Sequence, residues 1–212
     1  MTQLIPPTWP LQRWGMDLVG PLPPSQGVNK FTIVAIEYFT RWIEAKPLAR
    51  ITSETVRKFF WQNIIYRFGV PRILIVDNGK QFDSNSFKQL CQSIGTKVAF
   101  ASVYDPESNG AVTRANRVIF SAIAKTLFNL RKGKWAEELS KVVWSHNTTA
   151  SRTTRFTPFK LLYGEEAMLP EEARHQSLRV IKQALANDEE YSKKTIEGTR
   201  LEAIESITKY QE

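Results

Sequence analysis

Residues 68–82 read FGVPRILIVDNGKQF, and the centre of this stretch decides the fold. Residues 72–76 are a short, almost wholly apolar run, which is typical of a strand buried on both faces of a parallel sheet. The run stops at Asp77, and Asn78 and Gly79 then form a common turn sequence. The stretch therefore predicts a buried parallel strand with a carboxylate at its carboxyl end.

Alternating helices and strands are predicted on both sides of this strand. A helix over residues 54–68 follows an N-cap at Thr52 or Ser53 and buries one face. That face consists of Val56, Phe59, Phe60, Ile64 and Phe68. A second helix covers residues 84–94 and is closed by Gly95, and a further strand covers residues 97–102. This alternation predicts parallel strands joined by helical crossovers.

The N-terminal part of the chain predicts three strands in an antiparallel meander. They cover residues 13–19, 30–38 and 42–48, which are rich in β-branched and aromatic residues. With the two later strands, they predict an α/β fold with a five-stranded mixed sheet and helices on both faces. This order of elements resembles the ribonuclease-H-like fold.

The C-terminal half predicts helices. A long helix after a polar loop at 103–109 has a buried stripe of Val112, Ala115, Ile119, Ala122, Ile123, Thr126 and Leu127. Helices are also expected over residues 135–146 and 157–163, the second with Pro158 in its first turn. A charged helix is expected from about residue 187 to the end, as a C-terminal helical extension. We expect three parts: an extended arm (1–10), a core (11–164) and a loop with a charged helix (165–212).

Charge divides the chain unevenly. The net charge is +8, but residues 166–212 carry 7 Lys/Arg and 10 Asp/Glu, a net of −3, so residues 1–165 carry +11. Cationic side chains displace phosphate counterions, so a basic core suits a polyanion-binding protein. A surface that is merely basic and well solvated is the alternative.

Asp17 and Asp77 are the first candidates for chemistry. Each lies at or near the end of a predicted strand, where ligands of α/β sheets collect. Two carboxylates brought together repel unless a cation lies between them, and such a pair suits Mg²⁺ or Mn²⁺. Two such metals commonly serve hydrolysis and transfer of phosphodiesters. The alternative is that each residue is an exposed turn aspartate.

Four motifs in order carry a family resemblance. They are RWGMDLVGPLP (13–23), FGVPRILIVDNGKQF (68–82), SNGAVTRANR (108–117) and TPFKLLYG (157–164). Together they strongly resemble the integrase core of gypsy-like LTR retrotransposons, a retroviral-type integrase, from about residue 10 to residue 164. The resemblance implies two metal ions, strand transfer of element DNA into a host duplex, and a dimer through core helices.

The family pattern is an Asp, Asp, Glu triad with 35 residues between the last two members. Asp17 and Asp77 match the first two, but the third position is Thr113. A neutral hydroxyl cannot supply the anionic oxygens that hold a second metal, so impaired catalysis is expected. Asp105 and Glu107 stand where relatives have His and Gln, and either is an alternative carboxylate ligand.

Other residues near the motifs are candidates for nucleic-acid contact. The resemblance places the loop with Lys80 and Gln81 beside the DNA end. Asn109 opens the predicted catalytic helix. Asn116 and Arg117 follow Thr113 by three and four residues, so they share nearly the same helical face. Arg117 is expected to contact a phosphate, with a solvated arginine as the alternative.

Features that are missing also shape the expectation. His146, His175 and Cys91 are too few and too badly spaced for the two-His, two-Cys zinc module of retroelement integrases. No stretch of 18 apolar residues and no secretory signal is visible, so no membrane span and a nuclear or cytoplasmic location are expected. We expect the chain to be a fragment of a longer polyprotein.

The sequence thus supports three hypotheses. The first is a retrotransposon-derived integrase core that binds nucleic acid and a divalent metal and is impaired in polynucleotidyl transfer. The second is a non-catalytic DNA-binding or interaction module retained by a host. The third is an active nuclease whose third metal ligand has moved to Glu107 or Asp105.

Overall fold

The computed structural model describes residues 9–25, 28–77, 79–100, 121–122, 124–126, 128, 133–170 and 189–211. These residues belong to two compact units, residues 1–146 and 147–212. The division into arm, core and extension expected from the sequence stays a prediction.

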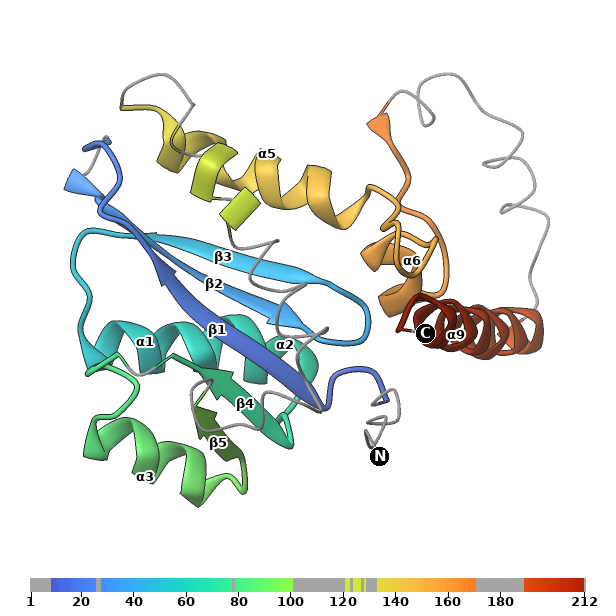
Figure 1. Cartoon of the computed structure of the whole chain (residues 1–212), viewed down its shortest axis with the longest axis horizontal. Helices are drawn as coiled ribbons and strands as arrows, with labels where there is room; N and C mark the ends of the chain where they lie inside the picture. The colour runs from blue at the N-terminus through green and yellow to red at the C-terminus, as the bar shows by residue number, and fades with distance from the viewer. Residues whose placement is uncertain are drawn as a thin grey trace. The chain divides into compact units, whose positions relative to one another are not determined.

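The first unit is built on one five-stranded sheet (Figure 1). Its strands are β1 (Arg13–Val19), β2 (Phe31–Glu37), β3 (Ile43–Leu48), β4 (Ile73–Val76) and β5 (Lys97–Phe100). The order across the sheet is β3-β2-β1-β4-β5. β1, β2 and β3 pair antiparallel, whereas β4 pairs parallel with both β1 and β5. The predicted mixed sheet is therefore confirmed.

A continuous helical run follows the meander. It comprises α1 (Ser53–Phe59), the π-helical η2 (Phe60–Ile65) and α2 (Tyr66–Phe68). Thr52 caps its start, because its side chain accepts a hydrogen bond from the Thr55 backbone N–H at 3.1 Å. The run ends at Gly69, where φ is +87° and a glycine is favoured. The predicted helix is confirmed, but its π-helical middle was not predicted.

Helices cover both faces of the sheet. Trp135 and Leu139 of α5 (Trp135–Asn147) pack on Val34, Ile36 and Ile75 of one face. The Trp135 indole N–H also donates to the Pro23 carbonyl at 2.6 Å, so the start of α5 is fixed by both packing and a hydrogen bond.

The opposite face of the sheet packs on the long helical run. The Trp14 ring of β1 contacts the Phe68 ring of α2 with centroids 5.2 Å apart. α3 (Asn85–Ser93), capped by the Ser84 hydroxyl, contacts both α1 and β5. The two-faced coverage expected of this α/β fold is confirmed.

The second unit joins α6 (Pro158–Tyr163) to α9 (Glu189–Gln211). The Arg200 guanidinium of α9 donates to the carbonyls of Leu161 and Leu162, at 3.3 and 3.4 Å, and so satisfies acceptors near the end of α6. Gly164 ends α6 with φ of +91°, and any side chain there would clash with Ile196. The short helix and the C-terminal helix predicted from the sequence are both present.

One buried stripe predicted from the sequence is wrong where it can be checked. Ala122 and Thr126 are exposed, and the Thr126 hydroxyl donates to the Ala122 carbonyl at 2.9 Å within the helix. Threonine is mostly exposed in folded proteins and alanine has little apolar surface to bury, so their spacing alone does not fix a buried face. The other five positions of this stripe lie outside the described residues.

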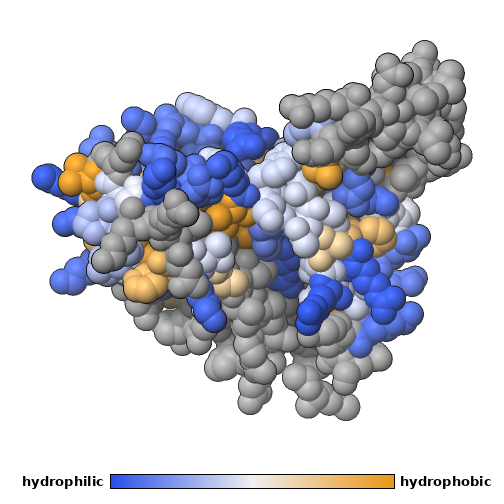
Figure 2. All heavy atoms as spheres, turned by 90° about the horizontal axis from the view of Figure 1, so that it is seen from above, coloured by the Kyte–Doolittle hydropathy of each residue, from blue (hydrophilic) through white to orange (hydrophobic). Residues whose placement is uncertain are grey.

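The described surface is mainly polar. None of the described helices combines the length and apolar content needed to cross a bilayer. In the view of Figure 2, hydrophilic residues dominate, and hydrophobic ones form isolated spots among the described residues.

Candidate metal and nucleic-acid site

Asp17 and Asp77 occupy neighbouring positions on two adjacent parallel strands. The last registered pair between β1 and β4 joins Met16 to Val76, and the two aspartates follow directly. Neighbouring strands lie about 4.8 Å apart, so this register brings the two backbones close at the carboxyl ends of the paired segments. The two sequence-predicted metal ligands therefore share one edge of the sheet.

Both aspartates are placed on the α5 face of the sheet. Asp17 pairs with Val34 of β2, and Ile75 precedes Asp77 by two residues. Val34 and Ile75 both belong to the core cluster under α5. Because residues alternate between faces along an extended chain, Asp17 and Asp77 fall on that face. Asp17 is half-buried and Asp77 is exposed.

A close contact between Gly15 of β1 and Tyr38 supports the position of Asp17. Gly15 lies two residues earlier on the same face, and the Tyr38 ring lies over it. A Cβ atom at position 15 would come within 2.9 Å of Tyr38 Cε2, so a side chain there requires Tyr38 to move. Leu18 donates its backbone N–H to Asp17 Oδ1 at 2.8 Å. The sequence interpretation missed Gly15 and Tyr38, although a glycine inside a strand signals close approach.

The loop after β4 brings Gln81 towards Asp77. The Gly79 backbone N–H donates to Asp77 Oδ1 at 3.1 Å. A Cβ atom added to Gly79 would clash with the Gln81 amide and lie 3.0 Å from Asp77 Oδ1, so a side chain there would require the end of the Gln81 side chain to move. Lys80 is exposed in the same loop. The predicted loop residues thus lie next to the second aspartate.

Aromatic packing holds this loop to the core. Phe82 is fully buried, and its ring lies 5.9 Å from the Phe87 ring of α3. The Ser84 hydroxyl, which also caps α3, donates to the Gln81 carbonyl at 3.0 Å. These contacts anchor the loop residues just before α3 to the core.

The donor set at this edge fits one divalent cation. Asp17 and Asp77 supply carboxylate oxygens, the ligands that Mg²⁺ and Mn²⁺ prefer, and Asp77 is open to water that would complete the coordination shell. The Oδ1 atom of each accepts a backbone N–H, which fixes the orientation of the carboxylates. Within the described part of the chain, no group of three or more His, Cys, Asp or Glu residues could hold a metal.

The remaining predicted site residues belong to the segment between β5 and α5. Thr113, Asn109, Asn116 and Arg117 lie outside the described residues, as do the alternative ligands Asp105 and Glu107. Their roles stay predictions.

A buried polar cluster, which the sequence interpretation missed, lies at the turn between β2 and β3. Glu37 Oε2 accepts hydrogen bonds from the Thr40 N–H at 2.6 Å, the Thr40 hydroxyl at 2.8 Å and the Phe39 N–H at 3.1 Å. Burial raises the pKa of Glu37 and lowers the pKa of Arg41. The Oε2 atom of Glu37 therefore closes the turn by accepting from three donors.

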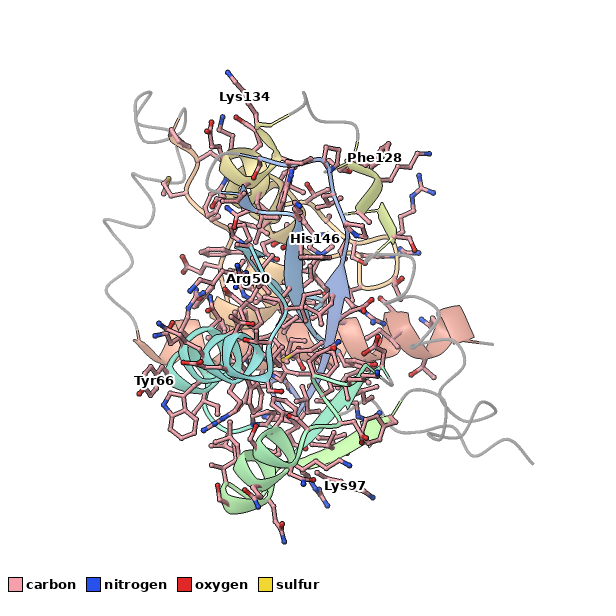
Figure 3. All side chains as sticks on the ribbon, turned by 90° about the vertical axis from the view of Figure 1, so that its left-hand side faces the viewer. Arg50, Tyr66, Lys97, Phe128, Lys134 and His146 are labelled. Carbon is pink, nitrogen blue, oxygen red and sulfur yellow. The ribbon has the colours of Figure 1, made fainter. Side chains whose placement is uncertain are left out.

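The same turn contacts the end of α5 through His146, which Figure 3 labels. His146 Nε2 lies 3.0 Å from the Arg41 carbonyl oxygen, which can only accept, so the ring must donate. Burial lowers the pKa of His146, which favours the neutral ring. These contacts tie α5 to the β2–β3 turn.

The fold and the register define a class. A mixed sheet of order β3-β2-β1-β4-β5, with helices on both faces and two aspartates at one edge, is a ribonuclease-H-like domain. Solved structures share this fold. The HTLV-2 integrase catalytic core domain in complex with magnesium, in a trimeric form, has a TM-score of 0.52 and 22% identity, covering 71% of this chain and 95% of that one. The catalytic core domain of BIV integrase has a TM-score of 0.53 and 24% identity, covering 78% and 97%.

The family follows from the sequence comparisons. Residues 7–106 match the family model described as "Integrase core domain". The chain is 31% identical over 167 residues to the Pro-Pol polyprotein of feline foamy virus, and 26% identical over 170 residues to the Pol polyprotein of transposon 412 from Drosophila melanogaster. Through residues 7–106 the chain belongs to the integrase core domain family of retroviral and retrotransposon Pol polyproteins.

These relatives are much longer than the matched region. The matches cover 79% and 80% of this chain, but only 14% of each polyprotein. The comparisons support the predicted family and fold, and the gypsy-like subtype stays a prediction.

Proposed function

We propose that this chain is the catalytic core of a retroelement integrase, which binds DNA and holds one divalent cation between Asp17 and Asp77. The observation that carries this proposal is the register of β1 and β4, which sets the two aspartates at neighbouring positions on the same face. Family membership supports DNA integration as the reaction in which this site takes part.

Charge supports DNA as the partner. Residues 1–165 carry a net charge of +11, whereas residues 166–212 carry −3. Most of the basic part corresponds to the unit that contains the sheet and the two aspartates. A polyanion is attracted to such a surface, and Lys80 is exposed directly beyond Asp77.

The residues of the site have distinct proposed roles. Asp17 and Asp77 bind Mg²⁺ or Mn²⁺, which in such sites lowers the pKa of bound water and polarises the phosphodiester. Gln81, in the loop that follows Asp77, orients a DNA end. Lys80, in the same loop, pairs with a phosphate. By family resemblance, Asn109, Asn116 and Arg117 contact the DNA from the catalytic helix.

Thr113 limits the chemistry in this proposal. The family pattern has a glutamate at this position, and a threonine hydroxyl offers no anionic oxygen for a second cation. Two-metal phosphodiester transfer needs both the attacking and the leaving oxygen stabilised, so strand transfer should be strongly impaired.

A nicking assay tests the proposal. The substrate is a duplex that mimics an element end, with Mn²⁺, and the proteins are wild type, Thr113→Glu and Thr113→Glu combined with Asp77→Asn. We expect little or no nicking by wild type, measurable nicking by Thr113→Glu, and its loss in the double variant. Nicking by Thr113→Glu that persists with Asp77→Asn would contradict the assigned site.

The same assay tests the alternative hypothesis of an active nuclease whose third metal ligand is Glu107 or Asp105. Nicking by wild type that disappears on Glu107→Gln or Asp105→Asn would show that another carboxylate replaces the missing glutamate. DNA binding without nicking in any variant would favour a non-catalytic binding module. We also propose a homodimer, which light scattering of the purified chain would measure directly.

A further inference from the structure

Three basic residues gather at the end of the sheet opposite to the aspartate pair. Arg13 is the first residue of β1, Lys97 is the first residue of β5, and Arg72 directly precedes β4. Together with Gln12 and Ile73 they line a cavity of about 310 Å³ (Figure 3 labels Lys97). We call this cavity the basic pocket.

Sheet hydrogen bonds hold the basic pocket in shape. Arg13 is in register with Ile73, and Ile73 is in register with Lys97. The Ile73 N–H donates to the Gln12 carbonyl at 3.0 Å, and the Lys97 N–H donates to the Arg72 carbonyl at 3.0 Å. The backbone positions of these residues are therefore fixed before any ligand arrives, which lowers the entropic cost of binding.

The pocket concentrates positive charge. Arg13 lines the pocket with only 7% of its surface exposed, whereas Arg72 and Lys97 are exposed. No acidic residue occurs among its described lining residues. The ion pairs seen among the described residues involve neither Arg72 nor Lys97. An anion would relieve the mutual repulsion of these cations.

We propose that the basic pocket binds phosphate groups, either of a compact oligophosphate or of a nucleic-acid backbone. Arginine presents a planar fork of donors that suits phosphate oxygens, and lysine adds a point charge. The Gln12 amide provides a further neutral donor at the wall. Two linked phosphates match the arrangement of three cations on adjacent strand ends better than a single negative charge does.

This site is separate from the aspartate pair. Arg13 precedes Asp17 by four residues in the same strand, which corresponds to about 13 Å along an extended chain. Phosphate binding in the basic pocket needs no divalent cation and neither aspartate. It can therefore be measured independently of the proposed integrase chemistry.

Calorimetric titration with sodium pyrophosphate, without divalent ions, tests the pocket. The site variant is Arg72→Gln with Lys97→Gln, since both residues are exposed and their loss should not impair folding. The control variant is Arg57→Gln with Lys58→Gln, which removes the same charge from two exposed positions on α1. We expect saturable binding by wild type, about ten-fold weaker binding by the site variant, and nearly unchanged binding by the control.

A duplex-DNA arm identifies the source of the phosphate. If the pocket binds the nucleic-acid backbone, pyrophosphate should displace DNA. The slope of log affinity against log salt should then become shallower by up to about 1.8 in the site variant, a larger change than in the control variant. If it takes free oligophosphate, the DNA slope should change equally in both variants. The proposal is overturned if wild type shows no saturable pyrophosphate binding, or if the two variants weaken it equally.

Discussion

Replacing Gly15 by alanine tests the packing that supports the aspartate site. The new Cβ would lie 2.9 Å from Tyr38 Cε2 and 3.4 Å from Ile36 Cγ2. Tyr38 is only 6% exposed and Ile36 is fully buried, so neither side chain has free space into which it can move. Overpacking of this kind costs about 1–3 kcal/mol.

A smaller favourable effect opposes this cost. Alanine in a strand is preferred over glycine by about 0.5–1 kcal/mol, because glycine loses more conformational freedom on folding. The expected net loss for Gly15→Ala is therefore about 0–2.5 kcal/mol in the free energy of unfolding. In a Tyr38→Leu background the ring is absent, so Gly15→Ala should instead be neutral or stabilising by up to about 1 kcal/mol.

Urea unfolding of the four proteins in this cycle measures the coupling between positions 15 and 38. Tryptophan fluorescence and circular dichroism are followed together, because the two compact units need not unfold as one. The reasoning is refuted if Gly15→Ala stabilises the wild-type protein. It is equally refuted if the loss is the same with leucine at position 38.

Three further predictions concern other parts of the chain. Burial lowers the pKa of His146, so its imidazole binds a proton more readily in the unfolded chain than in the folded one. The contribution of the neutral ring to the free energy of unfolding should be fully present above pH 6.5. Below that pH it should fall by at most about 1.4 kcal/mol per pH unit. In His146→Gln, the urea midpoint should therefore fall less between pH 7.5 and 5.5 than it does in wild type. An unchanged pH dependence would contradict this role of His146. Duplex-DNA affinity should decrease steeply and linearly on a log–log plot against salt, as expected from the net charge of +11 over residues 1–165. A flat plot would exclude phosphate contacts as the driving force. Gly198→Ala should stabilise α9 by about 0.5–1 kcal/mol, because no atom lies within 4 Å of the added Cβ. The melting temperature should therefore rise, and a lower melting temperature would show crowding at this position.

The sheet was largely predictable because its sequence signals are local. β1 begins and ends at the predicted residues. β4 is one residue shorter than predicted, because it begins at Ile73 and not at Arg72. Apolar runs and turn residues report directly on which backbone is buried and where it must stop. The same signals placed Asp77 at the end of one strand and Asp17 near the end of another, and the parallel register of β1 and β4 brings the two positions together.

Other features depend on contacts that local patterns do not encode. The π-helical turn at Phe60–Ile65 has the same apolar spacing as an α-helix, so periodicity cannot distinguish the two. The burial of Glu37 with Arg41 depends on α5, which lies about a hundred residues later in the chain. Charged residues are normally expected at the surface, so no sequence rule indicates this cluster.

The basic pocket likewise depends on contacts that local sequence patterns do not encode. Arg13, Arg72 and Lys97 are far apart in the sequence, and each is an ordinary basic residue before a strand. Only the parallel pairing of β1, β4 and β5 brings them to one end of the sheet. A basic residue at the start of several predicted parallel strands was the available signal.

Manganese binding tests the central claim most directly. Titration of the full chain with Mn²⁺, followed by electron paramagnetic resonance of the free ion, counts sites in wild type, Asp17→Asn, Asp77→Asn and Thr113→Glu. We predict one weak site in wild type, its loss in either aspartate variant, and a second site in Thr113→Glu. Wild-type Mn²⁺ affinity that survives in both Asp17→Asn and Asp77→Asn would contradict the account.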